Sequence, residues 1–145
     1  MTGTTVEYQG GLRCRAEHIE SGVIVITDAP KDHHGLGSSF SPSDILAVSL
    51  GSCILTIMGI AAQSMDIDIA GATATVEKEM ANAPRRIARI AVAVHVPHNP
   101  NPDQVRKLEA AAHACPVHKC LDPALDTPIT FTWGNSTSLT AMAST

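Results

Sequence analysis

Aromatic residues are scarce in this sequence of 145 residues, which contains two Phe, one Tyr and one Trp. The core must therefore be aliphatic, and we expect no aromatic platform on which bases of single-stranded nucleic acid could stack. Basic residues are also few: the formal net charge is −4, and no run of Lys or Arg exceeds two residues. Binding to a phosphate backbone requires a basic patch that is missing here, so the sequence predicts no nucleic-acid partner.

A secretory signal is missing as well, because residues 1–9 contain no apolar stretch of the kind that such signals carry. A domain of this length buries roughly two thirds of the surface of its unfolded chain, so it can form a core without disulfides. We therefore expect a cytoplasmic protein whose cysteines are mostly reduced. The four cysteines are Cys14, Cys53, Cys115 and Cys120.

Charged residues are absent from Ile45 to Met65, a stretch that is long enough to span a bilayer. Small and polar residues dilute this stretch, however, and its flanks are Asp44 and Asp66 rather than Lys or Arg. The better interpretation is a buried central helix, and we expect no membrane partner.

The periodicity of the sequence predicts a mixed α+β fold. Alternating patterns and turn signals indicate strands at 6–8, 12–17, 23–27, 67–80, 87–96 and 127–133. Helices are expected at 42–63, 102–114 and 116–121, and a loop rich in Gly, Ser and Asp at 28–41. One domain over 1–133 and a flexible tail at 134–145 complete the predicted organisation.

Two helix starts have clear capping signals. Ser41 suits the N-cap position of the first helix, and Asp44 stands where a capping box places its acid. Asn101 and Gln104 form the same pattern at the second helix, and a proline follows each predicted cap.

Cys53 lies in the middle of the first predicted helix. At helical spacing it shares a face with small and polar residues, namely Ser49, Ser52, Thr56, Gly59 and Gln63. This face could serve tight helix packing, with Cys53 as a small buried side chain. The alternative is a reactive thiol, held on a rigid element and facing a second polar group.

The segment "HACPVHKC" at 113–120 carries two more thiols. Cys115 precedes Pro116, so we expect it to cap the short helix, where free backbone N–H groups would lower its pKa. A cap without chemistry is the alternative. A zinc site would combine Cys115 with His118, Cys120 and His113, but the spacing matches no common finger. A helix here would also direct His118 and Cys120 to opposite sides, so we expect no metal.

The remaining cysteines carry weaker signals. Cys14 alternates with Arg13 and Arg15 on a predicted strand, so it should point to the opposite face from both, toward the core. Cys120 is expected to be a packed thiol.

Three stretches together resemble the OsmC/Ohr family of thiol-dependent proteins. These are "FSPSDILAVSLGSCILTIMG" (40–59), "LEAAAHACPVHKCL" (108–121) and a final "FTW" (131–133). Two others, "LRCRAEH" (12–18) and "APRRIARI" (83–90), resemble the OsmC-like branch more than the best-studied hydroperoxide resistance enzymes. The resemblance extends over residues 6–133.

The resemblance implies an OsmC-like α+β fold, with antiparallel sheets around long central helices and two chains intertwined as a homodimer. It also implies that Cys53 is the peroxidatic cysteine, which becomes a sulfenic acid, and that Cys115 is the resolving cysteine. A dithiol reductant, of the lipoyl type or a small thiol, would reopen their disulfide. The local argument favours Cys115 as the more activated thiol; we follow the resemblance and assign that role to Cys53.

An arginine from the N-terminal strands activates the peroxidatic thiol in this family, because an opposite charge favours the thiolate. Arg13 is our candidate and Arg15 the alternate, although either could be an exposed charge at a strand edge. The hydroperoxide-specialised members place a Glu after the helix-opening proline to orient this arginine. Here that position is Ser43, and Asp44 is the nearest acid.

We therefore predict a thiol peroxidase that reduces organic hydroperoxides, and hydrogen peroxide less well. No cofactor is expected, because the O–O bond is weak and a positioned thiolate suffices. The alternatives are a non-catalytic or small-ligand-binding OsmC-like protein and a structural metal protein that uses residues 113–120.

Overall fold

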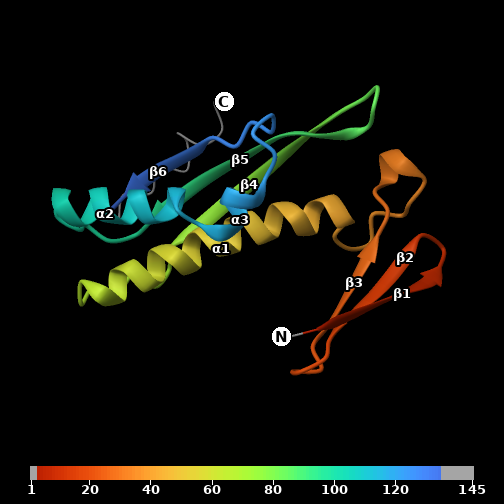
Figure 1. Ribbon diagram of the computed structural model, residues 1–145, viewed down its shortest axis with the longest axis horizontal. Coiled ribbons are helices and arrows are strands. Elements are labelled where there is room, and N and C mark those ends of the chain that lie inside the picture. Colours follow the sequence, from red (N-terminus) through yellow and green to blue (C-terminus); the bar gives the residue numbers. More distant parts are fainter. Residues whose placement is uncertain (1–2, 135–145) are drawn as a thin grey trace. The chain divides into compact units, whose positions relative to one another are not determined.

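The computed structural model describes residues 3–134, which form two compact units that divide between Leu46 and Ala47. In chain order the elements are β1 (Thr4–Gly10), β2 (Arg13–His18), β3 (Ile24–Asp28), the 3₁₀ helix η1 (Lys31–His33), α1 (Pro42–Ser64), β4 (Thr73–Ala81), β5 (Arg86–Val96), α2 (Pro102–His113), α3 (Pro116–Cys120) and β6 (Ile129–Trp133) (Figure 1). This mixture confirms the predicted α+β class. Apart from Gly134, the tail expected at 134–145 lies outside the described residues. The single domain over 1–133 stays a prediction.

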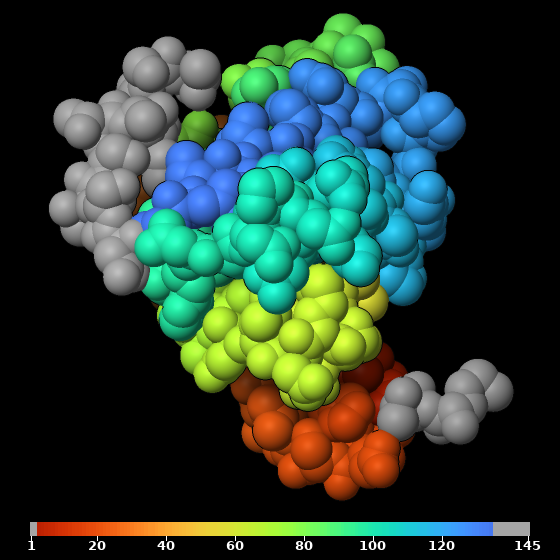
Figure 2. All heavy atoms as spheres, turned by 90° about the vertical axis from the view of Figure 1, so that its left-hand side faces the viewer, coloured from red at the N-terminus to blue at the C-terminus, as the bar shows by residue number. Residues whose placement is uncertain are grey.

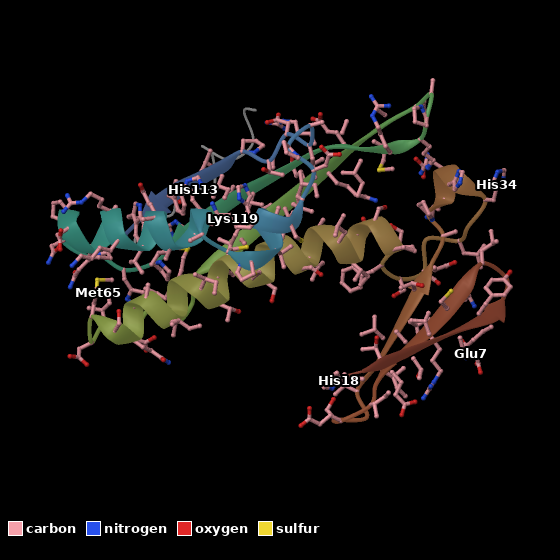
Figure 3. All side chains as sticks on the ribbon, in the orientation of Figure 1. Glu7, His18, His34, Met65, His113 and Lys119 are labelled. Atoms are coloured by element: carbon pink, nitrogen blue, oxygen red, sulfur yellow. The ribbon has the colours of Figure 1, made fainter. Side chains whose placement is uncertain are left out.

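The N-terminal unit is built on a three-stranded antiparallel sheet in the order β1-β2-β3. Figure 3 labels Glu7 on β1 and His18 at the end of β2. Every buried apolar side chain of the described chain belongs to residues 47–115, so this sheet covers no core of its own. Its large apolar side chains are instead exposed, among them Val6 and Tyr8 on β1 and Ile24 and Val25 on β3.

The loop predicted at 28–41 folds back on β3. The backbone N–H of Asp28 donates to Phe40 O at 3.0 Å, and the Ser39 hydroxyl donates to Ile26 O at 2.7 Å. A side chain at Gly35 could not fit, because its Cβ would lie 1.7 Å from Ala29 O. These contacts hold the loop, including η1, as an ordered flap along the end of β3.

Helix α1 begins with the predicted capping box. The Ser41 hydroxyl accepts from the Asp44 N–H at 3.1 Å, and the Asp44 carboxylate accepts from the Ser41 N–H at 2.9 Å. Asp44 therefore caps the helix. The buried face of α1 consists of Ala47, Leu50, Gly51, Ile54, Met58 and Ala62.

The other face of α1 is open, so the expected buried central helix is buried on one face only in the single chain. Val48 and Ile60 are 44% and 59% exposed in the single chain. By length and composition α1 is the one helix of the described residues that could cross a membrane, a test that core helices of soluble proteins also pass.

The C-terminal unit packs its helices on one face of the sheet β4-β5-β6. The predicted alternation in β5 is confirmed, since Ile90, Val92, Val94 and Val96 are all buried. Figures 1 and 2 show α1 and α2 on the same side of this sheet, and side chains from both helices share one core with β5. This core contains Cys115 and, at its margin, Cys53.

Two details of this unit differ from expectation. β6 pairs with β5 in parallel rather than antiparallel, because α2 and α3 carry the chain back before β6 starts. Residues 67–72 precede β4 instead of belonging to it. There the Asp68 side chain accepts from the Ala70 N–H at 2.8 Å, and this local turn replaces the start of the strand.

The close approach of α1 to β4 yields a stability prediction. A Cβ on Gly51 would lie 2.7 Å from Val76 Cγ2, and the stiff, β-branched valine cannot easily move aside. We expect Gly51→Ala to lower the free energy of unfolding by about 1–3 kcal/mol. Gly59→Ala on the same helix is the matched control, because its Cβ would meet nothing within 4 Å. Urea denaturation should show the control at or above wild-type stability; equal effects would contradict the packing argument.

Candidate functional site

Cys53 lies near the middle of α1, half-buried at the margin of the core. Ser52 and Thr56, two of the small and polar residues predicted to share a face with Cys53, are exposed, and the Thr56 hydroxyl donates to the Ser52 carbonyl of its own helix at 2.8 Å. Within the described chain this face therefore does not serve tight helix packing. The rigid 23-residue helix instead holds the Cys53 thiol at the boundary between core and surface.

Cys115 caps α3, as the sequence predicts. Its backbone is extended, its Sγ accepts from the His118 N–H at 3.2 Å, and Pro116 occupies the first helical turn. Its side chain is completely buried. The structure brings Cys53 and Cys115 together, since Cys53 packs against the core that contains Cys115 and the two thiols interact electrostatically, and all four cysteines are free thiols.

The prediction of a lowered pKa for Cys115 is wrong. Burial raises the pKa of the Cys115 thiol, because removal from water disfavours the thiolate. The hydrogen bond from the His118 N–H acts in the opposite direction, and the contact with Cys53 raises the pKa further. A five-residue helix cannot offset complete burial, so Cys115 rests as a neutral thiol.

His118 fixes the position of α3 through its side chain. Its Nε2 hydrogen-bonds the Thr127 hydroxyl at 3.0 Å, while its backbone N–H contacts Cys115. Figure 3 labels His113 at the end of α2 and Lys119 on α3, which frame the turn that carries Cys115. His118 therefore pairs locally, and Thr127 is a residue that sequence reasoning missed.

The other two cysteines have different surroundings. Cys120 is exposed, not packed as expected, and its thiol donates to Val117 O at 3.1 Å. The thiol lies at the outer end of a very short helix, which explains why the core does not cover it. Cys14 on β2 is partly buried. Within residues 3–134 no group of three His, Cys, Asp or Glu side chains is arranged to hold a metal ion.

Arg13 and Arg15 belong to the N-terminal unit and have different partners. Arg13 stands opposite Asp28 in the β2-β3 register, with its Nε 3.7 Å from Asp28 Oδ2. Arg15 pairs with Glu17 at 2.8 Å, and both of these side chains are partly exposed. That Arg13 activates Cys53 stays a prediction. Sequence reasoning missed Asp28, which the register of β2 and β3 places opposite Arg13.

The raised pKa of Cys115 has a consequence for stability at alkaline pH. The folded state holds the proton of the Cys115 thiol more tightly than the unfolded state does. The resulting stabilisation of the folded state is complete at pH values below the usual thiol pKa, and it is lost as the pH rises through the pKa that Cys115 has in the folded protein. In that window the free energy of unfolding should fall by up to about 1.4 kcal/mol per pH unit.

Urea denaturation under reducing conditions between about pH 8 and pH 10.5 measures this loss, with the window placed around the usual thiol pKa. Cys115→Ser should show a shallower decline than wild type, and Cys120→Ser should not differ from wild type. Equal slopes in all three proteins would contradict the buried neutral thiol.

This chain is similar to a known protein family in sequence and to several solved structures in fold. The model of the OsmC-like protein family matches residues 35–130. A crystal structure from Psychrobacter arcticus 273-4, provisionally described as an osmotic stress induced and detoxification response protein, is 43% identical, with 91% of this chain and 96% of that chain covered and a TM-score of 0.87.

Two more distant structures share the fold. The organic hydroperoxide resistance protein OsmC of Legionella pneumophila is 18% identical, with 91% and 96% of the two chains covered and a TM-score of 0.74. An organic hydroperoxide resistance protein of Elizabethkingia anophelis is 16% identical, with coverage of 94% and 96% and a TM-score of 0.70. Among curated proteins no significant match was found.

Proposed function

This chain belongs to the OsmC-like protein family, and on that premise we propose that it is a thiol-dependent peroxidase that reduces organic hydroperoxides through Cys53 and Cys115. The contact between a half-buried thiol on α1 and a buried neutral thiol at the α3 cap carries the proposal. Two structural relatives are named organic hydroperoxide resistance proteins, which supports this class of substrate.

In the first step the Cys53 thiolate attacks one oxygen of the hydroperoxide. An S–O bond forms, the O–O bond breaks, and the leaving alkoxide takes a proton to become an alcohol. Cys53 is thereby oxidised to a sulfenic acid. Arg13 would stabilise the thiolate and the negative charge that develops on the leaving oxygen.

In the second step Cys115 attacks the sulfenic sulfur of Cys53. An S–S bond forms, and the sulfenic oxygen leaves as water after it takes up a proton. The resting form of Cys115 suits this role, since a buried thiol with a raised pKa reacts poorly with peroxide itself. It therefore stays reduced until Cys53 has been oxidised.

A dithiol reductant then returns the site to its starting state. One thiolate of the reductant attacks the Cys53–Cys115 disulfide, and its second thiol releases the protein as two free thiols. Overall, one hydroperoxide and one dithiol become an alcohol, water and an oxidised reductant. We place this cycle in the cytoplasm, where dithiol reductants are available and free cysteines stay reduced.

We further propose that the protein works as a homodimer. The N-terminal unit exposes large apolar side chains on β1, on β3 and on its loops, and the open face of α1 adds Val48 and Ile60. A monomeric protein rarely exposes apolar surface of this extent, and a second copy is the partner that is always present.

Light scattering at micromolar concentration tests the dimer, and we expect twice the 15.2 kDa of one chain. Val6→Asp on β1, where the side chain is 67% exposed, should shift the equilibrium toward monomer. Glu7→Lys, the neighbouring charged position on the same strand, is the control and should leave the mass unchanged. A wild-type monomer would contradict the proposed assembly.

A single-turnover assay tests the peroxidase activity. The fully reduced protein is mixed with a small alkyl hydroperoxide or with hydrogen peroxide, and the free thiols are then counted. We expect the loss of two thiols for each hydroperoxide consumed, and faster reaction with the alkyl substrate. If thiols and hydroperoxide both persist, the protein is a binding module rather than a peroxidase.

A further inference from the structure

The strongest unexplained feature outside the thiol pair is the buried carboxylate of Asp28. It lies at the end of β3, directly opposite Arg13 on β2, and its side chain is completely buried. A buried carboxylate is costly unless its charge is paired and its oxygens are hydrogen-bonded. The surroundings of its two oxygens therefore indicate what this residue does.

The two carboxylate oxygens of Asp28 have different surroundings. Oδ2 accepts two hydrogen bonds from Ser38 of the flap, from the N–H at 2.9 Å and from the hydroxyl at 2.5 Å. Oδ1 is buried without a hydrogen-bond partner among the described residues. The flap therefore occupies only one of the two buried carboxylate oxygens.

Arg13 provides the complementary group. Its Nε is also buried without a hydrogen bond and lies 3.7 Å from Asp28 Oδ2, while its side chain as a whole is 41% exposed. The inner nitrogen of the guanidinium therefore faces Asp28, and the outer end reaches the surface. Held in this way, the two terminal amino groups remain available for another anion.

We propose that Asp28 is the positioning residue for Arg13: it holds the guanidinium by the inner nitrogen and thereby fixes the orientation of the terminal amino groups that the proposed role of Arg13 requires. Ser38 orients the carboxylate, so the flap is part of the same device. The inference rests on the proposed function, which gives Arg13 its task. In the hydroperoxide-specialised members a Glu after the helix-opening proline orients the arginine, and here Ser43 occupies that position. On our proposal Asp28, at the end of β3, supplies the missing carboxylate.

The ionisation of Asp28 supports this arrangement. The hydrogen bonds from Ser38 lower the pKa of Asp28 below its usual value, with a smaller lowering from the charge of Arg13, and these effects outweigh burial. The carboxylate is therefore charged at neutral pH. Arg15 has no comparable partner, because Glu17 on the same strand is only partly buried, whereas Asp28 is completely buried.

A double-mutant cycle separates positioning from simple structural support. Asp28→Asn keeps the shape of the side chain and removes its charge. We expect kcat/KM for a small alkyl hydroperoxide to fall on the order of 10- to 100-fold, the scale of a misplaced catalytic group. In an Arg13→Ala background the same change should cost less than about twofold, because nothing remains to be positioned.

Glu17→Gln is the matched control, since it breaks the other arginine–carboxylate pair of β2 and should leave kcat/KM within about twofold of wild type. An equal loss from Asp28→Asn in both backgrounds, or no loss in either, would overturn the proposal. If Asp28→Asn unfolds the protein, Ser38→Ala replaces it in the cycle. A severalfold loss that disappears without Arg13 supports the proposal, and a loss that persists overturns it.

The alkylation rate of Cys53 at pH 7, followed by peptide mapping, distinguishes this inference from the proposed function. Asp28→Asn should slow it only when Arg13 is present, whether or not the protein consumes hydroperoxide. If wild type is inactive but shows this Arg13-dependent effect, the peroxidase proposal fails and the positioning role stands. If wild type is active and Asp28→Asn reacts as wild type does, the positioning role fails.

Discussion

Cys53→Ser is expected to abolish hydroperoxide consumption, with a loss on the order of 1000-fold or more, because removing the attacking group leaves no nucleophile at the site. The remaining thiols cannot replace it. Cys115 is buried with a raised pKa, Cys14 belongs to the N-terminal unit, and Cys120 is exposed on the surface. A serine hydroxyl is not ionised at neutral pH, so it offers no comparable anion.

Stopped-flow measurement of hydroperoxide loss under single-turnover conditions provides the test. Cys120→Ser, which removes the most exposed thiol, is the control and should react as wild type does. Cys14→Ser should do the same. Activity that survives in Cys53→Ser would show that the chemistry belongs to another thiol, with the "HACPVHKC" segment as the first place to look.

Cys115→Ser should leave the first turnover intact and stop the cycle afterwards. Without the resolving thiol, Cys53 stays a sulfenic acid or is oxidised further to the sulfinic form. We expect steady-state turnover with a dithiol to fall on the order of 100-fold, the remainder coming from direct attack of the reductant on the sulfenic acid. Serine can still cap α3, so folding should survive this change.

Mass spectrometry of the oxidised proteins checks this prediction. The Cys115→Ser protein should gain one or two oxygen atoms at Cys53, whereas oxidised wild type should contain a Cys53–Cys115 disulfide within one chain. A dominant Cys115–Cys120 bond in wild type would contradict the assignment, as would full steady-state activity of Cys115→Ser.

Local signals in the sequence predicted the parts of the structure that depend on neighbouring residues. The capping boxes at Ser41 and Asn101 formed as expected, since each needs only a side chain and a backbone group three residues apart. The N-cap role of Cys115 and the alternation of β5 followed for the same reason.

Features that depend on distant segments were not predictable in the same way. The parallel pairing of β6 with β5 follows from the path of α2 and α3, which no local pattern encodes. The raised pKa of Cys115 comes from packing around it, which outweighs the cap that the sequence did indicate. The sequence pattern places Asp28 at the start of a loop, and only the strand register shows that it faces Arg13.

The uneven distribution of buried apolar side chains bears on the order in which the protein becomes stable. The first 46 residues leave the ribosome first, yet they contain no buried apolar side chain among the described ones. The well-packed unit, which carries both Cys53 and Cys115, is synthesised later. Local opening costs least where few apolar contacts are buried. Cys53 and Cys115 are therefore protected once the later unit has packed, while Arg13 and Asp28 reside in the segment that opens to proteases most easily.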